Sequence, residues 1–185
     1  ICTDSRKAKS NSIFFALKGE KFNGNKFAEE ALKKGCEYAI VDEEINEKNK
    51  RFILVKDCLQ TLQKLASFHR KKLKLPIIGI TGSNGKTTSK ELIFSVLSTK
   101  YNTHATKGNL NNHIGVPLSV LEICEKTEIS IIEMGANHTN EISLLSNIAK
   151  PNFGIITNIG KAHLKGFGSL DGVIQAKREL YENIK

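Results

Sequence analysis

The chain has 185 residues, 39% hydrophobic and 25% charged, which is the composition of a globular protein rather than of a disordered tail. Lysine and arginine outnumber the acidic residues 28 to 19, which gives a formal net charge of +9. Because the lysines are scattered and neither a base-stacking aromatic motif nor zinc-finger spacing occurs, we expect small anionic substrates and no nucleic-acid partner.

The cysteines lie far apart without a Cys-x-x-Cys pair, and there is no signal-like start and no apolar run of membrane-spanning length. We therefore expect reduced thiols, a cytoplasmic location and no membrane insertion. Cys36 and Cys124 adjoin apolar runs and are expected to pack inside the protein. The chain opens on Ile1 and its last helical pattern runs to Lys185, so we interpret it as a piece cut at both ends.

The first 75 residues form a small α/β unit by pattern. Strands are expected over 12–17, 37–41 and 52–55, alternating with helices over 25–35 and 57–72. Gly35 is a natural helix stop and Asp57 a natural N-cap. The basic run HRKKLKL at 69–75 is interpreted as a solvated helix end and linker.

A second series of alternating strands and helices is expected from residue 76. Apolar strands are expected over 77–80, 129–134 and 153–159. Helical patterns cover 89–100, a segment from about residue 114, 139–150 and the end of the chain. Strands that are apolar throughout and alternate with helices predict a parallel sheet covered on both faces, with ligands at the carboxyl ends of the strands. The expected fold class is thus α/β, with domains at 1–75 and 76–185.

The stretch GITGSNGKTTSKE at 79–91 departs by one residue from the usual phosphate-binding loop, because Ile80 stands where a glycine is common. The features that bind phosphate are still present. A buried strand, a glycine-rich turn and a helix N-terminus aim backbone N–H groups and a lysine at one point. The simpler alternative is an ordinary glycine turn with a solvated lysine. The surrounding strand and helix favour polyphosphate binding.

Other polar residues follow the expected strands. Glu133 ends one strand, where an acid can reach a loop-bound magnesium; the alternative is a capping or exposed glutamate. His163 follows the next strand and by itself is weak evidence. Asn109, Asn111 and Asn112 crowd one loop more densely than a turn requires.

Four stretches, in order along the chain, resemble motifs of the Mur ligase family: TGSNGKTTSKE, GNLNNHIGVPL, EMGANHTNEI and TNIGKAHLKGFGSLDGVIQAKRELY. The opening TDSRKAKSNSIFFALKGEKFNGNKF resembles the uridine-binding N-terminal domain of that family, so the resemblance covers nearly the whole chain. The family is known for the loop spacing found here. The motifs are most similar to those of members that join D-alanyl-D-alanine to UDP-N-acetylmuramoyl-tripeptide.

The resemblance implies a UDP-sugar domain, a P-loop ATPase domain and a C-terminal domain. This chain would hold most of the first and the front of the second. The implied reaction is ATP-dependent amide formation in peptidoglycan precursor synthesis, in which a carboxylate attacks the γ-phosphate and an amine then displaces phosphate from the acyl phosphate. We expect ATP and two Mg²⁺ ions as cofactors and a monomer. These residues alone are expected to be inactive, because much of the active site would lie outside them.

Residue by residue, the resemblance assigns Lys86 and Thr87 to the phosphates and a first magnesium, Glu133 to that ion, and His163 to a second ion. Asn112, or its neighbour Asn109, would lie near the phosphates and the acyl group as a catalytic residue. The full set assigned to the nucleotide is Gly82, Ser83, Asn84, Gly85, Lys86, Thr87, Thr88 and Asn109.

The residues assigned to the uridine substrate are Ser5, Arg6, Lys18, Gly19 and Asn23, with Asn158 also assigned to substrate. Two departures from the family pattern occur. The chain has Asn23-Gly24-Asn25 where Asp-Gly-His is common, which affects the uridine contacts. Asn140 replaces a glycine before Glu-Ile and is interpreted as a turn variation.

Lys177 falls in the middle of an apolar helical stripe formed by Leu170, Val173, Ile174 and Tyr181. The ordinary explanation is a packed stem with the ammonium reaching solvent. The resemblance implies instead a lysine that reacts with carbon dioxide, whose carbamate binds the second magnesium beside His163. Carbamylation needs a neutral amine, which burial favours by lowering the pKa of a lysine.

Two other functions stay open. One is a different ATP-dependent amide ligase, either another Mur-type enzyme or a folylpolyglutamate-type synthetase. The second is a nucleotide-binding module that uses the same loop without ligation. The sequence does not tell whether the third residue of the peptide substrate is lysine or diaminopimelate.

Overall fold

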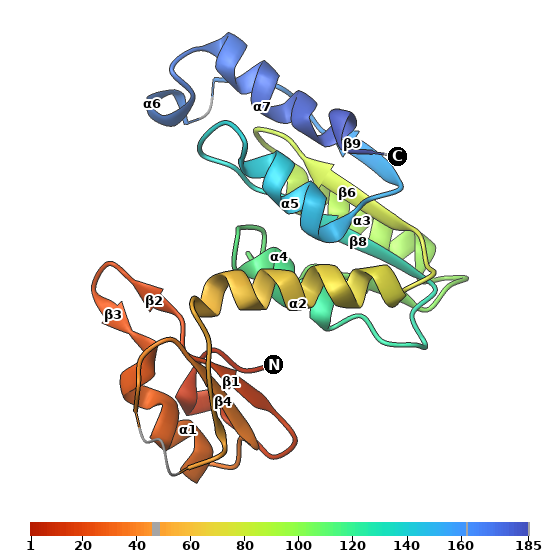
Figure 1. Ribbon diagram of the computed structural model, residues 1–185. Coiled ribbons are helices and arrows are strands. Elements are labelled where there is room, and N and C mark those ends of the chain that lie inside the picture. The colour runs from red at the N-terminus through yellow and green to blue at the C-terminus, as the bar shows by residue number, and fades with distance from the viewer. Residues whose placement is uncertain (46–48, 162, 185) are drawn as a thin grey trace. The chain divides into compact units, whose positions relative to one another are not determined.

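The computed structural model describes residues 1–45, 49–161 and 163–184, so Lys185 lies outside the described residues. The chain divides into two compact units, Ile1–Lys64 and Leu65–Lys185 (Figure 1), and each is described by itself. Both units mix helices with mainly parallel strands, which confirms the expected α/β class.

The first unit is built on a three-stranded parallel sheet with the order β1-β4-β5. These strands are β1 (Ile13–Phe15), β4 (Tyr38–Val41) and β5 (Phe52–Leu54), close to the expected runs. Helix α1 (Ala28–Lys33) packs on β4 and is followed by Gly35 at φ 114°, a backbone conformation that favours glycine and stops the helix as expected.

Several short elements that the sequence patterns did not predict precede α1. The 3-10 turn η1 (Ser5–Lys7) begins after Asp4. The antiparallel pair β2 (Lys18–Gly19) and β3 (Phe22–Asn23) then leads into a second 3-10 turn, η2 (Gly24–Phe27). Two-residue strands carry no readable alternation, which is why the pattern missed them.

Helix α2 (Cys58–Lys72) crosses the division between the units. Asp57 caps its start, accepting a hydrogen bond from the backbone N–H of Gln60 at 2.8 Å, as predicted. Near its end Ala66 joins the core of the second unit and His69 Nε2 lies 2.8 Å from the carbonyl of Ile123. The division expected from the sequence, after residue 75, lies beyond the end of this helix. The compact units divide within the helix, between Lys64 and Leu65.

Arg70 corrects the interpretation of the basic run as a solvated linker. Its side chain is buried, and its guanidinium donates to the carbonyls of Leu73, Leu75, Ala149 and Lys150 and to Asn152 Oδ1. Burial lowers its pKa from the ordinary arginine value. The arginine thereby ties the end of α2 to the segment between α5 (Glu141–Ala149) and the next strand.

The second unit contains a four-stranded sheet with the order β7-β8-β6-β9, and every pair is parallel. Three strands were expected: β6 (Ile77–Thr81), β8 (Ile129–Glu133) and β9 (Phe153–Ile156). The short edge strand β7 (Thr103–Ala105) was not. Since the register pairs Ile80 with Glu133 and Thr81 with Ile156, the carboxyl ends of β6, β8 and β9 meet at one edge of the sheet.

Helices cover both faces of this sheet. Figure 1 shows α5 on the near face and α3 (Lys86–Leu97) on the far face. The buried core lies on the face of α4 (Gly115–Leu121), α5 and α7 (Leu170–Glu182), with side chains that include Val120, Leu145 and Leu180. The short α6 (Leu164–Phe167) precedes α7.

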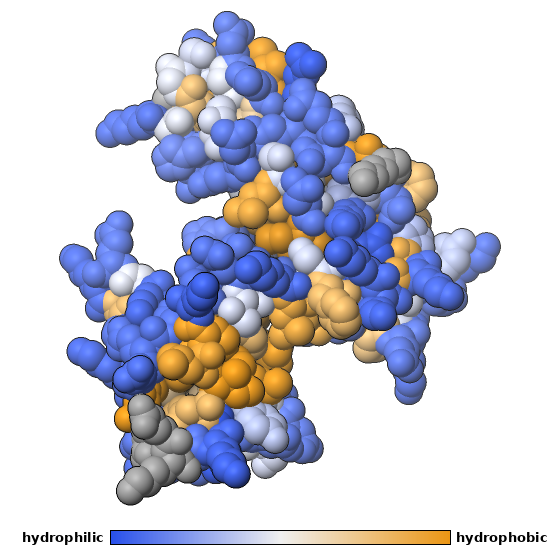
Figure 2. Space-filling view, in the orientation of Figure 1, coloured by the Kyte–Doolittle hydropathy of each residue, from blue (hydrophilic) through white to orange (hydrophobic). Residues whose placement is uncertain are grey.

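Hydrophilic side chains cover most of the second unit in Figure 2, whereas apolar side chains reach the surface of the first unit near β4. Ile53 and Leu54 on the edge strand β5 are among the exposed apolar residues. All four cysteines are free thiols; Cys36 is buried as expected, but Cys124 is exposed, which corrects its interpretation as a packed residue. Among the described residues, no helix has the length and apolar character needed to cross a membrane.

Candidate nucleotide and acyl-transfer site

The loop after β6 turns sharply at two glycines. Gly82 has φ 149°, and a Cβ there would lie 2.0 Å from Thr157 Oγ1, so no other residue fits. Gly85, at φ 75°, is the N-cap of α3, whose first residue is Lys86. The helix therefore begins inside the GKTT motif, earlier than the pattern predicted, and its first N–H groups have no partner within the helix.

The loop is fastened to the segment that follows β9. The backbone N–H groups of Ser83 and Asn84 donate to the carbonyl and side-chain oxygens of Asn158, both at 3.0 Å. Asn158 Nδ2 returns a hydrogen bond to the carbonyl of Asn84, and Ser83 Oγ bonds to Gly160. Asn158, which we had assigned to substrate, thus supports the phosphate loop in the structure.

Glu133 is fully buried at the end of β8, and each of its carboxylate oxygens accepts a hydrogen bond from a neighbouring side chain. Thr87 Oγ1 donates to Oε2 at 2.9 Å and Asn111 Nδ2 donates to Oε1 at 2.8 Å. The backbone N–H of Glu133 donates to Thr106 Oγ1 at 3.0 Å. The two residues assigned to the first magnesium are therefore in direct contact.

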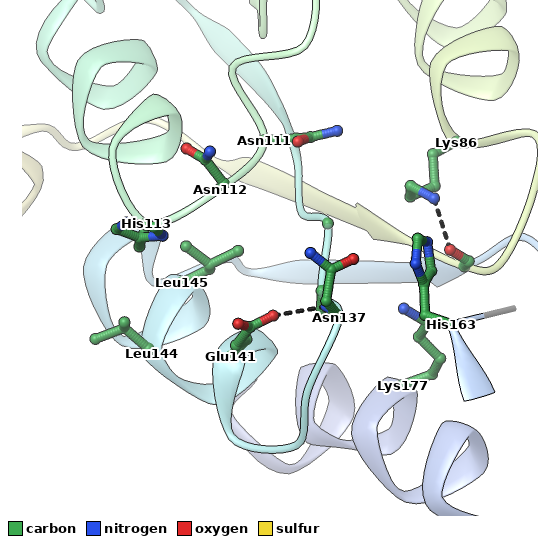
Figure 3. Close-up of a pocket in the computed structure, with 13 residues that line it drawn as sticks. Lys86, Asn111, Asn112, His113, Asn137, Glu141, Leu144, Leu145, His163 and Lys177 are labelled. Carbon is green, nitrogen blue, oxygen red and sulfur yellow. Dashed lines mark hydrogen bonds between the residues drawn. The ribbon is translucent and has the colours of Figure 1, made fainter. Parts of the chain in front are cut away.

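A cavity of about 360 Å³ opens beside the loop. Figure 3 shows the ring of His163 between the side chains of Lys86 and Lys177. His163 has φ 52°, a left-handed backbone conformation that few residues other than glycine adopt. The other residues that line the cavity are Gly82, Asn111, Asn112, His113, Gly135, Ala136, Asn137, Glu141, Leu144 and Leu145.

Lys177 is only 2% exposed, and its ammonium lies 5.4 Å from the centre of the Phe167 ring. Burial, and after it the charge of Lys86, lowers the pKa of Lys177 to about 8. Lys86 Nζ donates to the carbonyl of Gly82 at 2.8 Å. Within the described residues neither lysine forms an ion pair with a carboxylate. The two lysines therefore form no ion pair among the described residues, although the Glu141 carboxylate also lines the cavity.

The asparagines of the amide-rich loop make contacts that differ from the roles expected for them. Asn112 lines the cavity, but its side-chain oxygen accepts from the backbone N–H groups of Ile114, the N-cap of α4, and of Gly115, the first residue of that helix. Asn109 is exposed and does not line the cavity. Asn111, to which the resemblance gave no role, is the residue that contacts Glu133.

The first unit has a separate hollow of about 600 Å³. The rings of Phe22 and Phe27 are stacked at its side, with centroids 5.2 Å apart and planes 9° apart. The hollow is lined by Thr3, Asp4, Ser5, Arg6, Phe14, Phe22, Phe27 and Glu30. Ser5 and Arg6, both assigned to the uridine substrate, therefore lie here, and the two phenylalanines were not predicted.

The other residues assigned to uridine lie on the β2–β3 hairpin. Lys18 forms ion pairs with Asp42 and Glu43, which raise its pKa to about 12. Gly19 pairs with Phe22 across the hairpin. Asn23 Nδ2 donates to Glu43, and its oxygen caps η2. None of these three lines the hollow.

Among the described residues there is no group of three or more histidine, cysteine, aspartate or glutamate side chains that could hold a metal by itself. The donors present at the loop nevertheless suit magnesium, because the Glu133 carboxylate and the Thr87 hydroxyl are hard oxygen ligands and magnesium commonly completes its shell with phosphate and water. The residues present therefore fit the expected ion.

The comparisons with known families cover both units. Residues 80–185 match the model of the Mur ligase middle domain, and residues 1–70 match that of the Mur ligase family, catalytic domain. The chain belongs to the Mur ligase family. The resemblance carried by the motifs is thereby confirmed.

Several relatives of this Mur ligase chain share one name. A UDP-N-acetylmuramoyl-tripeptide--D-alanyl-D-alanine ligase of Bacillus subtilis is 44% identical over 100% of this chain and 41% of its own length. The structure of MurF from Acinetobacter baumannii superposes with a TM-score of 0.93 at 42% identity, covering 99% of this chain and 40% of that one. MurF from Thermotoga maritima, solved with ADP, gives 0.90 at 34% identity, covering 98% and 42%. The chain thus spans about two fifths of these relatives.

Proposed function

We propose that the full-length protein is the ligase that joins D-alanyl-D-alanine to UDP-N-acetylmuramoyl-tripeptide at the expense of ATP. The observation that carries this proposal is the meeting of Lys86, His163 and Lys177 in one cavity, directly beside a phosphate loop. Family membership, and the activity named for relatives 38–45% identical to this chain, support it.

The loop and the first turn of α3 bind the triphosphate. The N–H groups at the start of the helix and the Lys86 ammonium supply positive charge where the γ-phosphate is transferred. On ATP binding Lys86 exchanges its hydrogen bond to the Gly82 carbonyl for phosphate oxygens. Ser83 and Asn84 serve by holding the loop in shape through Asn158, since their own N–H groups are already bonded.

Thr87 and Glu133 would hold the first magnesium, and His163 with a carbamylated Lys177 would hold the second. These ions, when bound, neutralise charge on the phosphates and on the reacting carboxylate. The pKa of about 8 leaves roughly a tenth of the Lys177 amine neutral at pH 7, which is the form that adds to carbon dioxide. Addition of the neutral amine nitrogen to the carbon of CO₂ releases one proton and leaves an anionic carbamate; counted from the protonated lysine, two protons are released.

The acyl substrate places its terminal carboxylate beside His163. A carboxylate oxygen attacks the γ-phosphorus and ADP departs, which leaves an acyl phosphate. The free amine of D-alanyl-D-alanine then attacks the acyl carbon, loses a proton and expels inorganic phosphate. Asn112, at the wall of the cavity, is placed to donate to the acyl oxygen as negative charge develops there.

The hollow of the first unit would receive the uridine nucleotide. Its stacked phenylalanines present flat apolar surface to a base, while Ser5 and Arg6 supply polar groups for the ribose or the diphosphate. The protein would work in the cytoplasm as a monomer, where its UDP-linked and ATP substrates are found.

The test is a phosphate-release assay on the full-length protein with ATP, magnesium, UDP-N-acetylmuramoyl-tripeptide and D-alanyl-D-alanine, omitting one component at a time. We expect release only with all of them, and the tripeptide with lysine and with diaminopimelate should be compared. Release that needs a single amino acid in place of the dipeptide would point to another amide ligase. Release stimulated by nucleic acid alone would contradict ligation.

A further inference from the structure

Lys90 is a buried lysine that neither the phosphate loop nor the cavity uses. It lies in the second turn of α3, its side chain is 1% exposed, and it is among the largest fully buried side chains of the protein. Its ammonium donates to the backbone carbonyl of Thr106 at 2.6 Å and forms an ion pair with Glu91 at 2.9 Å. Glu91 is itself 60% exposed, so this ion pair compensates little of the cost of burying the ammonium.

The partner of Lys90 explains why a charge is kept there. Thr106 follows β7 directly and is 2% exposed. Its hydroxyl accepts from the N–H of Glu133, and its own N–H donates to the carbonyl of Ile131 on β8. Lys90 thus fixes the residue that holds the backbone at the end of β8, where the carboxylate of Glu133 must face Thr87.

The same anchor lies at the base of the amide-rich loop. The chain leaves Thr106 and returns at Asn111, whose amide donates to the other oxygen of Glu133. Thr87 and Lys90 are three residues apart on one face of α3, so the helix contacts Glu133 directly through Thr87 and indirectly through Lys90 and Thr106. Thr87 and Asn111 thus bind the carboxylate of Glu133, whereas Lys90 acts through Thr106 on its backbone N–H.

We propose that Lys90 is a positioning residue for magnesium: through Thr106 it sets the orientation of Glu133 and so the affinity of the nucleotide site for the metal. This inference rests on the proposed function only in taking Glu133 and Thr87 as the magnesium ligands. A buried lysine kept only for stability is a weak alternative, because an apolar side chain of similar length commonly serves a buried position equally well.

The experiment measures ADP binding to the full-length protein by calorimetry across a magnesium titration, and also in EDTA. In Lys90→Met we expect the magnesium concentration for half-maximal enhancement of ADP affinity to rise about tenfold or more, the usual effect of losing an outer-shell partner. ADP affinity in EDTA should stay within about twofold of the unmodified protein, because the loop and Lys86 are intact. This readout does not need ligation, so it is separable from failure of the proposed function.

Matched variants guard against a trivial loss of structure. Thr106→Val removes the acceptor for the Glu133 N–H and should reproduce the magnesium effect, whereas Thr106→Ser keeps the hydroxyl and should not. Glu91→Gln removes the ion pair but leaves the bond from Lys90 to Thr106, and should leave the magnesium dependence unchanged. If Lys90→Met does not fold, the threonine pair decides. An unchanged magnesium dependence in Thr106→Val, or an equal loss of ADP binding with and without magnesium, would overturn the proposal.

Discussion

One lysine from each unit illustrates two opposite electrostatic environments. On the first unit Lys18 is exposed and lies against Asp42 and Glu43, which raise its pKa to about 12. In the second unit Lys177 is buried and forms no ion pair with any described residue, and burial lowers its pKa to about 8. The charge of Lys18 is thus balanced by two carboxylates in contact with it, whereas the charge of Lys177 is offset only at longer range by Glu179 and Glu141.

The surroundings of the two binding hollows follow the same division. In the first unit Arg6 is bonded to Asp4 at 2.7 Å beside a wall of two phenylalanines, so that hollow offers mainly flat apolar surface. The cavity of the second unit sets Lys86 and Lys177 on either side of His163. This difference indicates which ligand each site suits. A nucleotide base suits the hollow of the first unit, and a polyphosphate with a carboxylate suits the cavity of the second.

The largest expected effect is on phosphoryl transfer by Lys86→Ala in the full-length protein. Loss of the loop lysine removes a charge that acts on the transferring phosphoryl group, and we expect turnover to fall about 10³-fold or more. The melting temperature should change by no more than about 2 °C, because Lys86 is only half-buried at the first position of α3 and contributes little packing. Phosphate release and thermal unfolding measure the two quantities, and near-normal turnover would remove the loop from the mechanism.

The next effect concerns carbamylation of Lys177. Lys177→Ala should lower turnover roughly 10²-fold or more, because the carbamate oxygens proposed to bind the second ion would be missing. A small added carboxylate such as formate or acetate should restore part of the activity by entering the space left by the side chain. Lys86→Ala serves as the control that the same carboxylate does not rescue. An alanine variant with unchanged activity would count decisively against this role.

The architecture could be predicted from the sequence because its signals are local. The apolar runs at β6, β8 and β9, the glycine turn and the N-cap Asp57 each depend on near neighbours in the chain. The place of Lys177 on an apolar helical stripe was also a local signal, and the structure buries the side chain; its lowered pKa was expected only from the carbamylation that the resemblance implies.

What escaped prediction depends on partners distant in sequence. Arg70 looked like part of a solvated basic run, because the carbonyls that it binds near residue 150 are joined to it only by the fold. Lys90 and Asn111 meet Thr106 and Glu133 from two separate segments, and no spacing rule connects them. The density of asparagines pointed to the loop, but not to the member of it that touches the acid.

A third prediction tests the charge of Lys177 through stability, in full-length protein freed of magnesium and carbon dioxide. The pKa in the unfolded chain is near 10.5 and in the folded protein about 8, so below pH 8 both states carry the proton and the folded state bears the whole cost of the buried charge. That cost is on the order of 3 kcal/mol. Between pH 8 and 10.5 the unfolded state binds more protons, and stability therefore rises with pH.

Lys177→Met should accordingly be more stable than the unmodified protein at pH 7, and the difference should shrink by pH 9.5. Urea unfolding at both pH values gives the two free energies. Lys18→Met is the matched control on the other unit, since an exposed ion pair contributes only about 0–1 kcal/mol. A Lys177→Met variant that is less stable at pH 7, or a difference that does not change with pH, would show that the ammonium is compensated after all.

The smallest expected effect lies in the hollow of the first unit. Phe22→Ala removes one ring of the stacked pair, and a stacking contact contributes about 0.5–1.5 kcal/mol beyond buried area, so the affinity for a uridine nucleotide should fall about threefold to tenfold. Phe22 is 51% exposed, which limits any loss of stability. ADP affinity should not change, because the phosphate loop belongs to the other unit. Tyr38→Ala, an exposed aromatic outside the hollow, is the control. Calorimetric titration with uridine diphosphate and with ADP checks this prediction. An equal loss of affinity for both nucleotides would contradict the assignment of uridine to the first unit and of ADP to the second.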